Sequence, residues 1–273
     1  MKLSPSIKSL ISAAHAQPGA VPAPSRMVLT QLFDRIRSRA EQGGVGRESW
    51  LTLSTAGLLT VNSPEALCRL WDYAGDKSAS LEERVRDAAV MRETGLKCIS
   101  FNGIPRSIDN RGVPVRSCPG VDTHACSLPT TSNLQPTQER GRALWDSIYS
   151  PHHEKLLAKL GDSHPDLPVH ILNSHYGPNL ADPPQHSIVG RVLTSVIAIS
   201  CLRAQTGVGP QVTSHVFGLK KALEGADGKG LQGQDWLVSD EGVEWVLESV
   251  DDISRTVTLG QGSFAKGMEK AKL

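Results

Sequence analysis

The stretch that decides the fold runs from Gly190 to Ala222 and reads GRVLTSVIAISCLRAQTGVGPQVTSHVFGLKKA. Its first half is apolar on almost every side of a helix, so that helix must be buried on several faces. The segment Thr206–Pro210 then interrupts it with two glycines and a proline that suits the first turn of a new helix. On this second helix, residues recur at the spacing of one inward face: Val212, His215, Val216, Leu219 and Leu223. The stretch predicts a buried helical pair.

One member of that inward face is a histidine. A histidine that points into the core just after a tight turn occupies the kind of place where proteins position titratable chemistry. A core-facing histidine is also often a hydrogen-bonded structural residue. Both interpretations of His215 stay open at the level of sequence.

Helical patterns continue along the rest of the chain, and alternating strand patterns are nearly absent. The clearest helix starts are Ser63-Pro64, a capping box from Ser80 to Glu83, and Ser239–Glu241. We therefore predict an all-α bundle. The predicted organisation is a flexible leader 1–25, one domain 26–260 built from halves 26–110 and 137–260, a loop 111–136 between them, and a tail 261–273.

Composition narrows the choice of partners. The net charge is +1 and aromatic residues make up 4%, so neither nucleic acid nor an anionic membrane is predicted as a partner. The longest apolar run is too short to span a bilayer, so we expect a soluble protein.

The cysteines predict neither a disulfide framework nor a metal site. Their number is odd and they form no C-x-x-C pair, which favours a reducing compartment: Cys68, Cys98, Cys118, Cys126 and Cys201. A zinc site at Cys118, His124 and Cys126 lacks an evident fourth ligand, and the histidines of 152–186 share no helix face. We predict no metal and no organic cofactor.

Both ends of the chain resemble targeting segments. Ala271-Lys272-Leu273 at the C-terminus is a variant of the S-K-L peroxisomal signal, which predicts recognition by the peroxisomal import receptor. No acidic residue precedes Asp34, and Lys2 and Lys8 lie among several serines, as in mitochondrial transit peptides. We therefore predict a peroxisomal protein, with the mitochondrion as the alternative location.

Two blocks of the chain resemble the carboxymuconolactone decarboxylase/alkylhydroperoxidase-like superfamily. They are RVRDAAVMRETGLKCISFNGIPRSID, which begins at Arg84, and RVLTSVIAISCLRAQTGVGPQVTSHVFGLKKA, which begins at Arg191. Within that superfamily the chain is similar to the fungal branch described as mitochondrial or peroxisomal proteins. The resemblance implies an alkylhydroperoxidase-like helical bundle with two related halves, commonly assembled as a homo-oligomer.

The peroxidases of this superfamily carry C-x-x-C-x-x-x-H on the second helix of such a pair. Here the histidine position is His215, but the two cysteine positions hold Val208 and Gln211. Because thiol peroxidase chemistry needs a thiolate and a resolving partner, this departure removes the disulfide relay. Cys201 lies on the preceding helix, where the sequence offers it no paired cysteine.

The decarboxylase-like branch uses acid–base groups instead. The resemblance then implies that His215 gives or takes the proton, because its pKa lies near the working pH. Three further residues are candidates: Gln211 to orient the imidazole, Arg203 to bind a substrate carboxylate, and Glu93 as a second titrating group. Each also has a purely structural interpretation, as a helix-terminal or solvated side chain.

Three functional hypotheses follow. The first is a lyase- or isomerase-type enzyme that acts through His215 on a small carboxylated or carbonyl substrate. The second is a non-catalytic helical assembly protein on the same scaffold. The third is a thiol-dependent antioxidant enzyme that uses Cys201 with an external reductant.

Overall fold

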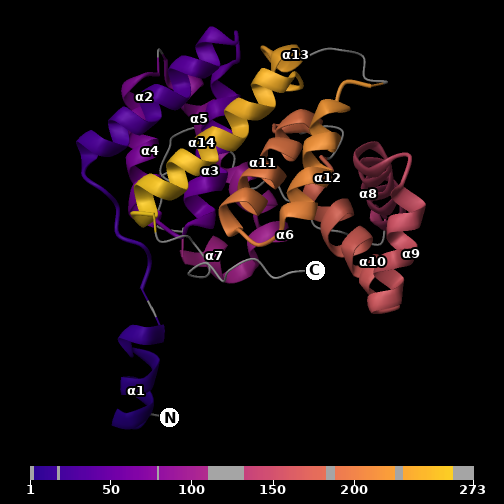
Figure 1. Cartoon of the computed structure of the whole chain (residues 1–273), viewed down its shortest axis with the longest axis horizontal. Helices are drawn as coiled ribbons and strands as arrows, with labels where there is room; N and C mark the ends of the chain where they lie inside the picture. The colour runs from indigo at the N-terminus through magenta and orange to yellow at the C-terminus, as the bar shows by residue number, and fades with distance from the viewer. Residues whose placement is uncertain are drawn as a thin grey trace.

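The computed structural model describes residues 3–16, 19–78, 80–109, 132–182, 188–224 and 230–260. Within these residues it contains helices and no strand, which confirms the all-α prediction (Figure 1). The elements are α1 (Pro5–Ile11), α2 (Arg26–Gln42), α3 (Arg47–Thr60), α4 (Pro64–Asp76), α5 (Leu81–Lys97), α6 (Ile99–Asn102), α7 (Ile104–Asp109), α8 (Leu134–Tyr149), α9 (His153–Ser163), α10 (Leu167–His170), the π-helix η4 (Ile171–Leu180), α11 (Gly190–Gln205), α12 (Gly209–Lys220), α13 (Gln234–Leu237) and α14 (Asp240–Thr258). A short 3₁₀ turn, Ala14–Ala16, follows α1.

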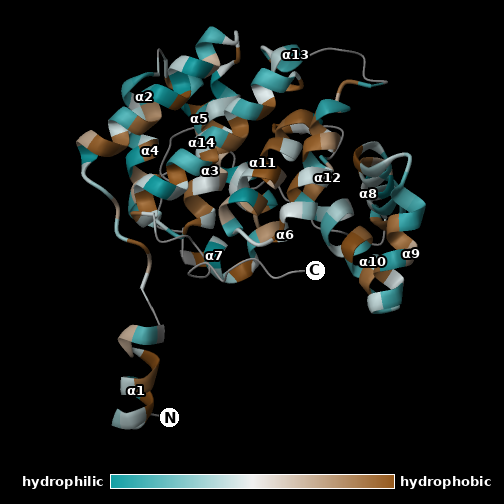
Figure 2. Ribbon diagram, in the orientation of Figure 1, coloured by the Kyte–Doolittle hydropathy of each residue, from teal (hydrophilic) through white to brown (hydrophobic). Residues whose placement is uncertain are grey.

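Helix α11 lies at the centre of the molecule. Every residue from Val192 to Leu202 is buried. The helix is covered by α3, α12 and α14, and Figure 2 shows apolar residues along α11 and α12 where they lie side by side. The break between the two helices comes at Thr206 and Gly207, whose φ angles are 64° and 74°. The buried helical pair predicted from Gly190–Ala222 is therefore confirmed.

Both predicted halves contribute to the same core. Helix α14, near the end of the second half, packs on α2 and α3 of the first (Figure 1). Its Trp245 is fully buried, and the indole Nε1 donates a hydrogen bond of 3.1 Å to the carbonyl oxygen of Ile36. Of the predicted loop 111–136, residues 111–131 lie outside the described residues, and α8 already begins at Leu134.

A smaller core lies beneath α8, α9 and η4, beside α12. Its buried members are Trp145, Ile148, Tyr176 and Leu180. Helix α8 and η4 approach closely because glycines face each other, and a Cβ atom on Gly141 would lie 2.4 Å from the backbone nitrogen of Gly177. We call α8, α9, α10 and η4 the side subdomain.

The predicted helix starts agree with the structure. Ser80 Oγ accepts a hydrogen bond of 3.1 Å from the Glu83 amide, and Ser239 Oγ accepts one of 3.2 Å from the Gly242 amide. These contacts satisfy amides that have no partner within the helix.

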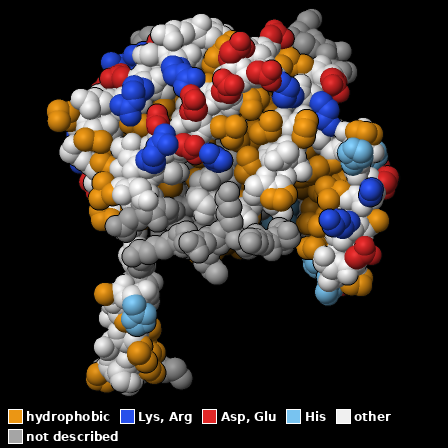
Figure 3. Space-filling view, in the orientation of Figure 1, with side chains coloured by type: hydrophobic (Ala, Val, Ile, Leu, Met, Phe, Trp, Pro, Cys, Tyr) orange, Lys and Arg blue, Asp and Glu red, His pale blue; other side chains and the backbone are white. Residues whose placement is uncertain are grey.

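The leader differs in part from the prediction. Where the sequence predicts flexibility up to Ser25, the amide of Val21 donates to the Asn62 carbonyl oxygen at 2.8 Å, and Ser63 Oγ donates to the Val21 carbonyl oxygen at 2.9 Å. Farther upstream, α1 stands away from the body and exposes its apolar residues Ile7, Leu10 and Ile11 (Figure 3), and Leu3 just before it is exposed as well. In the described part of the chain, no helix combines the length and the apolar character that crossing a membrane requires.

The contact between α8 and η4 gives a test of the fold. Gly141→Ala places a methyl group against backbone, so we expect it to lower the free energy of unfolding by about 1–3 kcal/mol. The matched control is Gly161→Ala on α9, where the nearest atom to the new Cβ would be Pro168 Cγ at 3.9 Å. That change should be neutral or stabilise by up to about 1 kcal/mol. Urea unfolding of both variants checks the prediction, and equal effects would contradict the close approach.

Candidate functional site

His215 lies on α12 and faces the side subdomain. Its residue exposure is 4%, and Nε2 is 3.2 Å from the hydroxyl of Tyr149. That hydroxyl lies 2.9 Å from the hydroxyl of Tyr176, so the three side chains form one hydrogen-bonded chain. The rings of Phe101 and Tyr149 meet the imidazole edge to face, each with centroids 5.8 Å from it. The predicted inward orientation of His215 is therefore confirmed, and aromatic side chains surround it.

The second component of the site is Arg191, in the first turn of α11. Its guanidinium donates to Ser147 Oγ at 2.9 Å, to Ser195 Oγ at 2.5 Å and to the Gly218 carbonyl oxygen at 2.8 Å. All of these acceptors are neutral. Among the described residues, no Asp or Glu lies within ion-pair distance of Arg191. The side chain is therefore held in place by hydrogen bonds without a neutralising carboxylate.

Burial and the charge of Arg191 set the protonation of this site. Burial lowers the pKa of Arg191 to about 10, so the guanidinium stays charged at neutral pH. Burial, together with the nearby Arg191 charge, lowers the pKa of His215 to about 4. Burial also raises the pKa of Tyr149 and of Tyr176. At neutral pH the imidazole and both phenols are therefore uncharged, and Arg191 carries the one positive charge of this group.

One nitrogen of the buried imidazole has no partner. His215 Nδ1 makes no hydrogen bond to any described residue, although its ring is almost completely enclosed. A buried polar atom without a partner is costly, and such atoms often mark functional positions. Depending on the tautomer, Nδ1 presents either an N–H or a lone pair.

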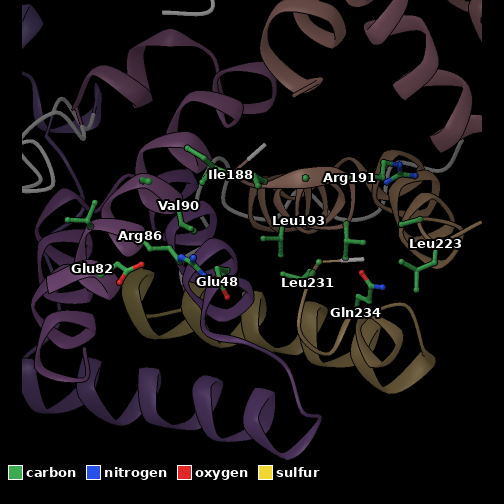
Figure 4. A pocket seen from close by; sticks show the side chains of 17 residues that line it. Glu48, Glu82, Arg86, Val90, Ile188, Arg191, Leu193, Leu223, Leu231 and Gln234 are labelled. Carbon is green, nitrogen blue, oxygen red and sulfur yellow. Dashed lines mark hydrogen bonds and ion pairs between the residues drawn. The ribbon is translucent and has the colours of Figure 1, made fainter. Parts of the chain in front are cut away.

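Arg191 also borders open space. It lines a cavity of about 820 Å³ between α5, α11 and the segment before α13 (Figure 4), and a second one of about 400 Å³ beside Ser147 and Ser150. Neither of these cavities is lined by His215. Arg191 therefore connects the two parts of the site, because it borders the cavities and its charge acts on the imidazole.

The predicted role of Arg203 is not supported by its position. Its guanidinium forms a two-pronged ion pair with Asp251 on α14, with both N–O distances at 2.8 Å. The side chain is 45% exposed and sits in the last turn of α11, at the opposite end from Arg191. A guanidinium already bound to a carboxylate is not free for a substrate, so Arg203 joins α11 to α14 instead.

Gln211 and Glu93 do not join the histidine either. Gln211 is exposed in the first turn of α12, and no hydrogen bond connects it to the imidazole in the described structure. Glu93 lies on α5 near a buried ion pair, in which Lys97 Nζ is 2.6 Å from Asp182 Oδ1. Burial raises the pKa of Glu93, Lys97 opposes the shift and Asp182 adds to it. Glu93 is thus a titrating group of a different cluster.

Cys201 has a neighbouring thiol that the sequence did not reveal. Its sulfur lies 3.5 Å from the sulfur of Cys98, at the end of α5, and both side chains are fully buried. Burial raises the pKa of Cys98 well above its usual value. Because a thiol must ionise to attack a peroxide, this environment disfavours the thiol-enzyme hypothesis even though a second sulfur is present.

The described residues contain no group of three His, Cys, Asp or Glu side chains arranged to hold a metal ion. The sequence motif Cys118, His124 and Cys126 lies outside the described residues. Comparisons of the chain with protein-family models, with curated proteins and with solved structures found no match.

The residues that do surround His215 were missed at the level of sequence: Phe101, Tyr149, Tyr176 and Arg191. One signal points to the arginine, because it lies in a run, 183–223, that contains no Asp or Glu. A charged residue that begins a helix apolar on all sides, far from any acid in sequence, is a candidate ligand-binding group. The tyrosines carry no such signal, because their meeting depends on how the side subdomain packs on α12.

The lowered pKa of His215 predicts a pH dependence of stability. Between pH 6.5 and pH 4 the unfolded chain binds a proton at this residue and the folded protein does not, so the free energy of unfolding falls as the pH falls. At pH 4.5 the histidine should account for a loss of about 2 to 3 kcal/mol relative to pH 7. Glutamine in His215→Gln can still bond Tyr149 but does not titrate. We therefore expect the free energy of unfolding of this variant to fall by about 2 to 3 kcal/mol less than that of the wild type between pH 7 and pH 4.5. Urea unfolding measures both, and identical pH dependences would contradict the account.

Proposed function

We propose that the protein binds a small carboxylate at Arg191 and performs acid–base chemistry on it through His215. The observation that carries this proposal is the half-buried guanidinium, which has neutral hydrogen-bond acceptors and no described carboxylate partner. A bound carboxylate would supply the missing negative charge. Of the five guanidinium N–H groups, four donate to Ser147, Ser195 and Gly218, and one on Nη1 is left for the ligand among the described residues. Arg191 thus takes the role that the sequence suggested for Arg203.

The electrostatics would couple binding to proton transfer. The positive charge of Arg191 contributes to the low pKa of His215, so a carboxylate that offsets this charge raises that pKa toward the working pH. The imidazole can then accept a proton from the carbon next to a carbonyl group and return it, with Tyr149 as its hydrogen-bond partner. Because His215 lines neither cavity beside Arg191, catalysis requires a movement of Tyr149 or Arg191 that brings the substrate to the ring.

The resemblance to the carboxymuconolactone decarboxylase/alkylhydroperoxidase-like superfamily agrees with this chemistry. The proposal includes an alkylhydroperoxidase-like bundle with two related halves, a homo-oligomeric assembly and a lyase- or isomerase-type reaction without a metal or organic cofactor. The all-α architecture and the buried pair α11–α12 support it.

A non-catalytic assembly protein is the second candidate. The specific observation in its favour is the enclosure of the imidazole, which is 4% exposed between Phe101 and Tyr149. In that case the chain of hydroxyls and the imidazole would hold the side subdomain against α12 and do nothing more.

We also propose that the protein enters peroxisomes through Ala271-Lys272-Leu273 and its import receptor. These residues lie outside the described residues, which end at Gly260. The basic, apolar helix α1, with Lys8 and no acidic residue, supports the mitochondrion as the alternative location.

Proton exchange in heavy water tests the enzymatic proposal. We expect the protein to accelerate deuterium incorporation into 4-oxopentanoate or a carboxylated butenolide, measured by proton NMR. His215→Gln should lower that rate by about 10²–10⁴-fold, because it removes the titrating group. The matched control Gln211→Ala changes an exposed residue of the same helix and should leave the rate unchanged. Wild-type exchange in His215→Gln, with circular dichroism unchanged, would reject the role of the histidine.

A further inference from the structure

The larger cavity beside Arg191 has a polarity that singles out one class of ligand. Its volume is about 820 Å³, within the range of about 300–1,000 Å³ typical of small-molecule sites. Its walls come from α3, α5, the start of α11, the residues just after α12 and the segment that leads into α13. Figure 4 shows Arg191 toward one end and Glu48, Glu82 and Arg86 toward the other.

Between these ends the walls are mostly apolar. Val90, Leu193 and Leu231 lie there (Figure 4), and Val85 and Ala89 on α5 also line the cavity. They come from three separate segments of the chain, so the apolar strip is a product of the fold and has no counterpart in any one sequence pattern. Such a wall gains free energy when it covers hydrocarbon.

The charges at the two ends are opposite in sign. One end has the guanidinium of Arg191, which lacks a described acidic partner. At the other end Glu48 pairs with Arg86 at 3.4 Å, and Glu82 adds a further carboxylate. A second anionic group on a ligand would therefore be repelled at the far end, whereas an uncharged end is tolerated.

We propose that this cavity binds unbranched aliphatic monocarboxylic acids of medium chain length. The carboxylate lies on Arg191 and the hydrocarbon chain lies along Val85, Ala89 and Leu231. This inference rests on the proposed function in one respect, because both place a carboxylate on Arg191. It adds the substrate class: an acid with one charged end and an apolar body.

Calorimetric titration with a homologous series tests the inference. We expect the dissociation constant to fall by about three- to fourfold for each added methylene from butanoate to octanoate. Octanol lacks the charge, and octanedioate carries a second carboxylate, so both should bind at least about tenfold more weakly than octanoate. Affinity independent of chain length, or equal affinity for octanoate and octanedioate, would overturn the inference.

Two pairs of variants locate the binding. Ala89→Phe fills the cavity and should weaken octanoate binding by about tenfold or more, whereas Ala158→Phe, on the exposed face of α9, should not. Arg191→Met should remove the preference for octanoate over octanol, and Arg26→Met, whose side chain is 68% exposed, should keep it. Arg191→Lys keeps the charge and serves if the methionine variant fails to fold. Unchanged octanoate binding in Ala89→Phe, or an unchanged preference for octanoate over octanol in a folded Arg191→Met variant, would place the ligand elsewhere and reject the inference.

The two proposals fail separately. Chain-length-dependent binding of the aliphatic acids, without proton exchange in 4-oxopentanoate or the carboxylated butenolide, would leave the cavity assignment intact and reject the acid–base function. Proton exchange in short oxo acids, with no gain in affinity from added methylenes, would reject the cavity assignment and leave the function intact.

Discussion

Between Val192 and Leu202 helix α11 has no solvent face, and the rest of the fold follows from the need to cover it. Its residues from Val192 to Leu202 are all buried, so other helices must pack around its full circumference. Helices α3, α12 and α14 meet this need, and they come from opposite ends of the chain. The same constraint draws the first turn of α11 into the interior, and with it the side chain of Arg191.

The positive charge of Arg191 influences both the neighbouring imidazole and the cavities that the side chain borders. The guanidinium is satisfied by Ser147, Ser195 and the Gly218 carbonyl group, which hold it but do not neutralise it. It helps to lower the pKa of His215, and it borders two cavities. A ligand carboxylate that binds there would change the charge felt by the imidazole, so binding and protonation are linked by proximity alone.

The sequence allowed good predictions of what depends on neighbours along the chain. The break at Thr206–Pro210 and the caps at Ser80 and Ser239 are local patterns, and the structure agrees with them. The predicted inward face of α12 holds in part, because His215 and Leu219 are buried whereas Val212 and Val216 are half-buried. The partners of His215 do not follow from such local patterns. Gln211 and Arg203 lie near His215 in sequence, but one is exposed and the other is bound to Asp251. The residues that do meet the imidazole come from α6 and α8, with Tyr176 of η4 bonded to Tyr149 behind them, and only tertiary packing brings them together. The same holds for Cys98 and Cys201, whose sulfur atoms meet across a long separation in the chain.

The central claim is that the guanidinium of Arg191 awaits a carboxylate from a ligand. Nitrogen-15 NMR of the arginine side chains, recorded while octanoate labelled with carbon-13 at its carboxylate is added, tests this most directly. The account predicts that the Nε–H signal of Arg191 shifts in a saturable way together with the ligand carboxylate, and that the ligand shift disappears in Arg191→Met. An Arg191 signal that does not shift at saturating octanoate would contradict the account. So would an ion pair between Arg191 and a carboxylate of the protein before any ligand is added.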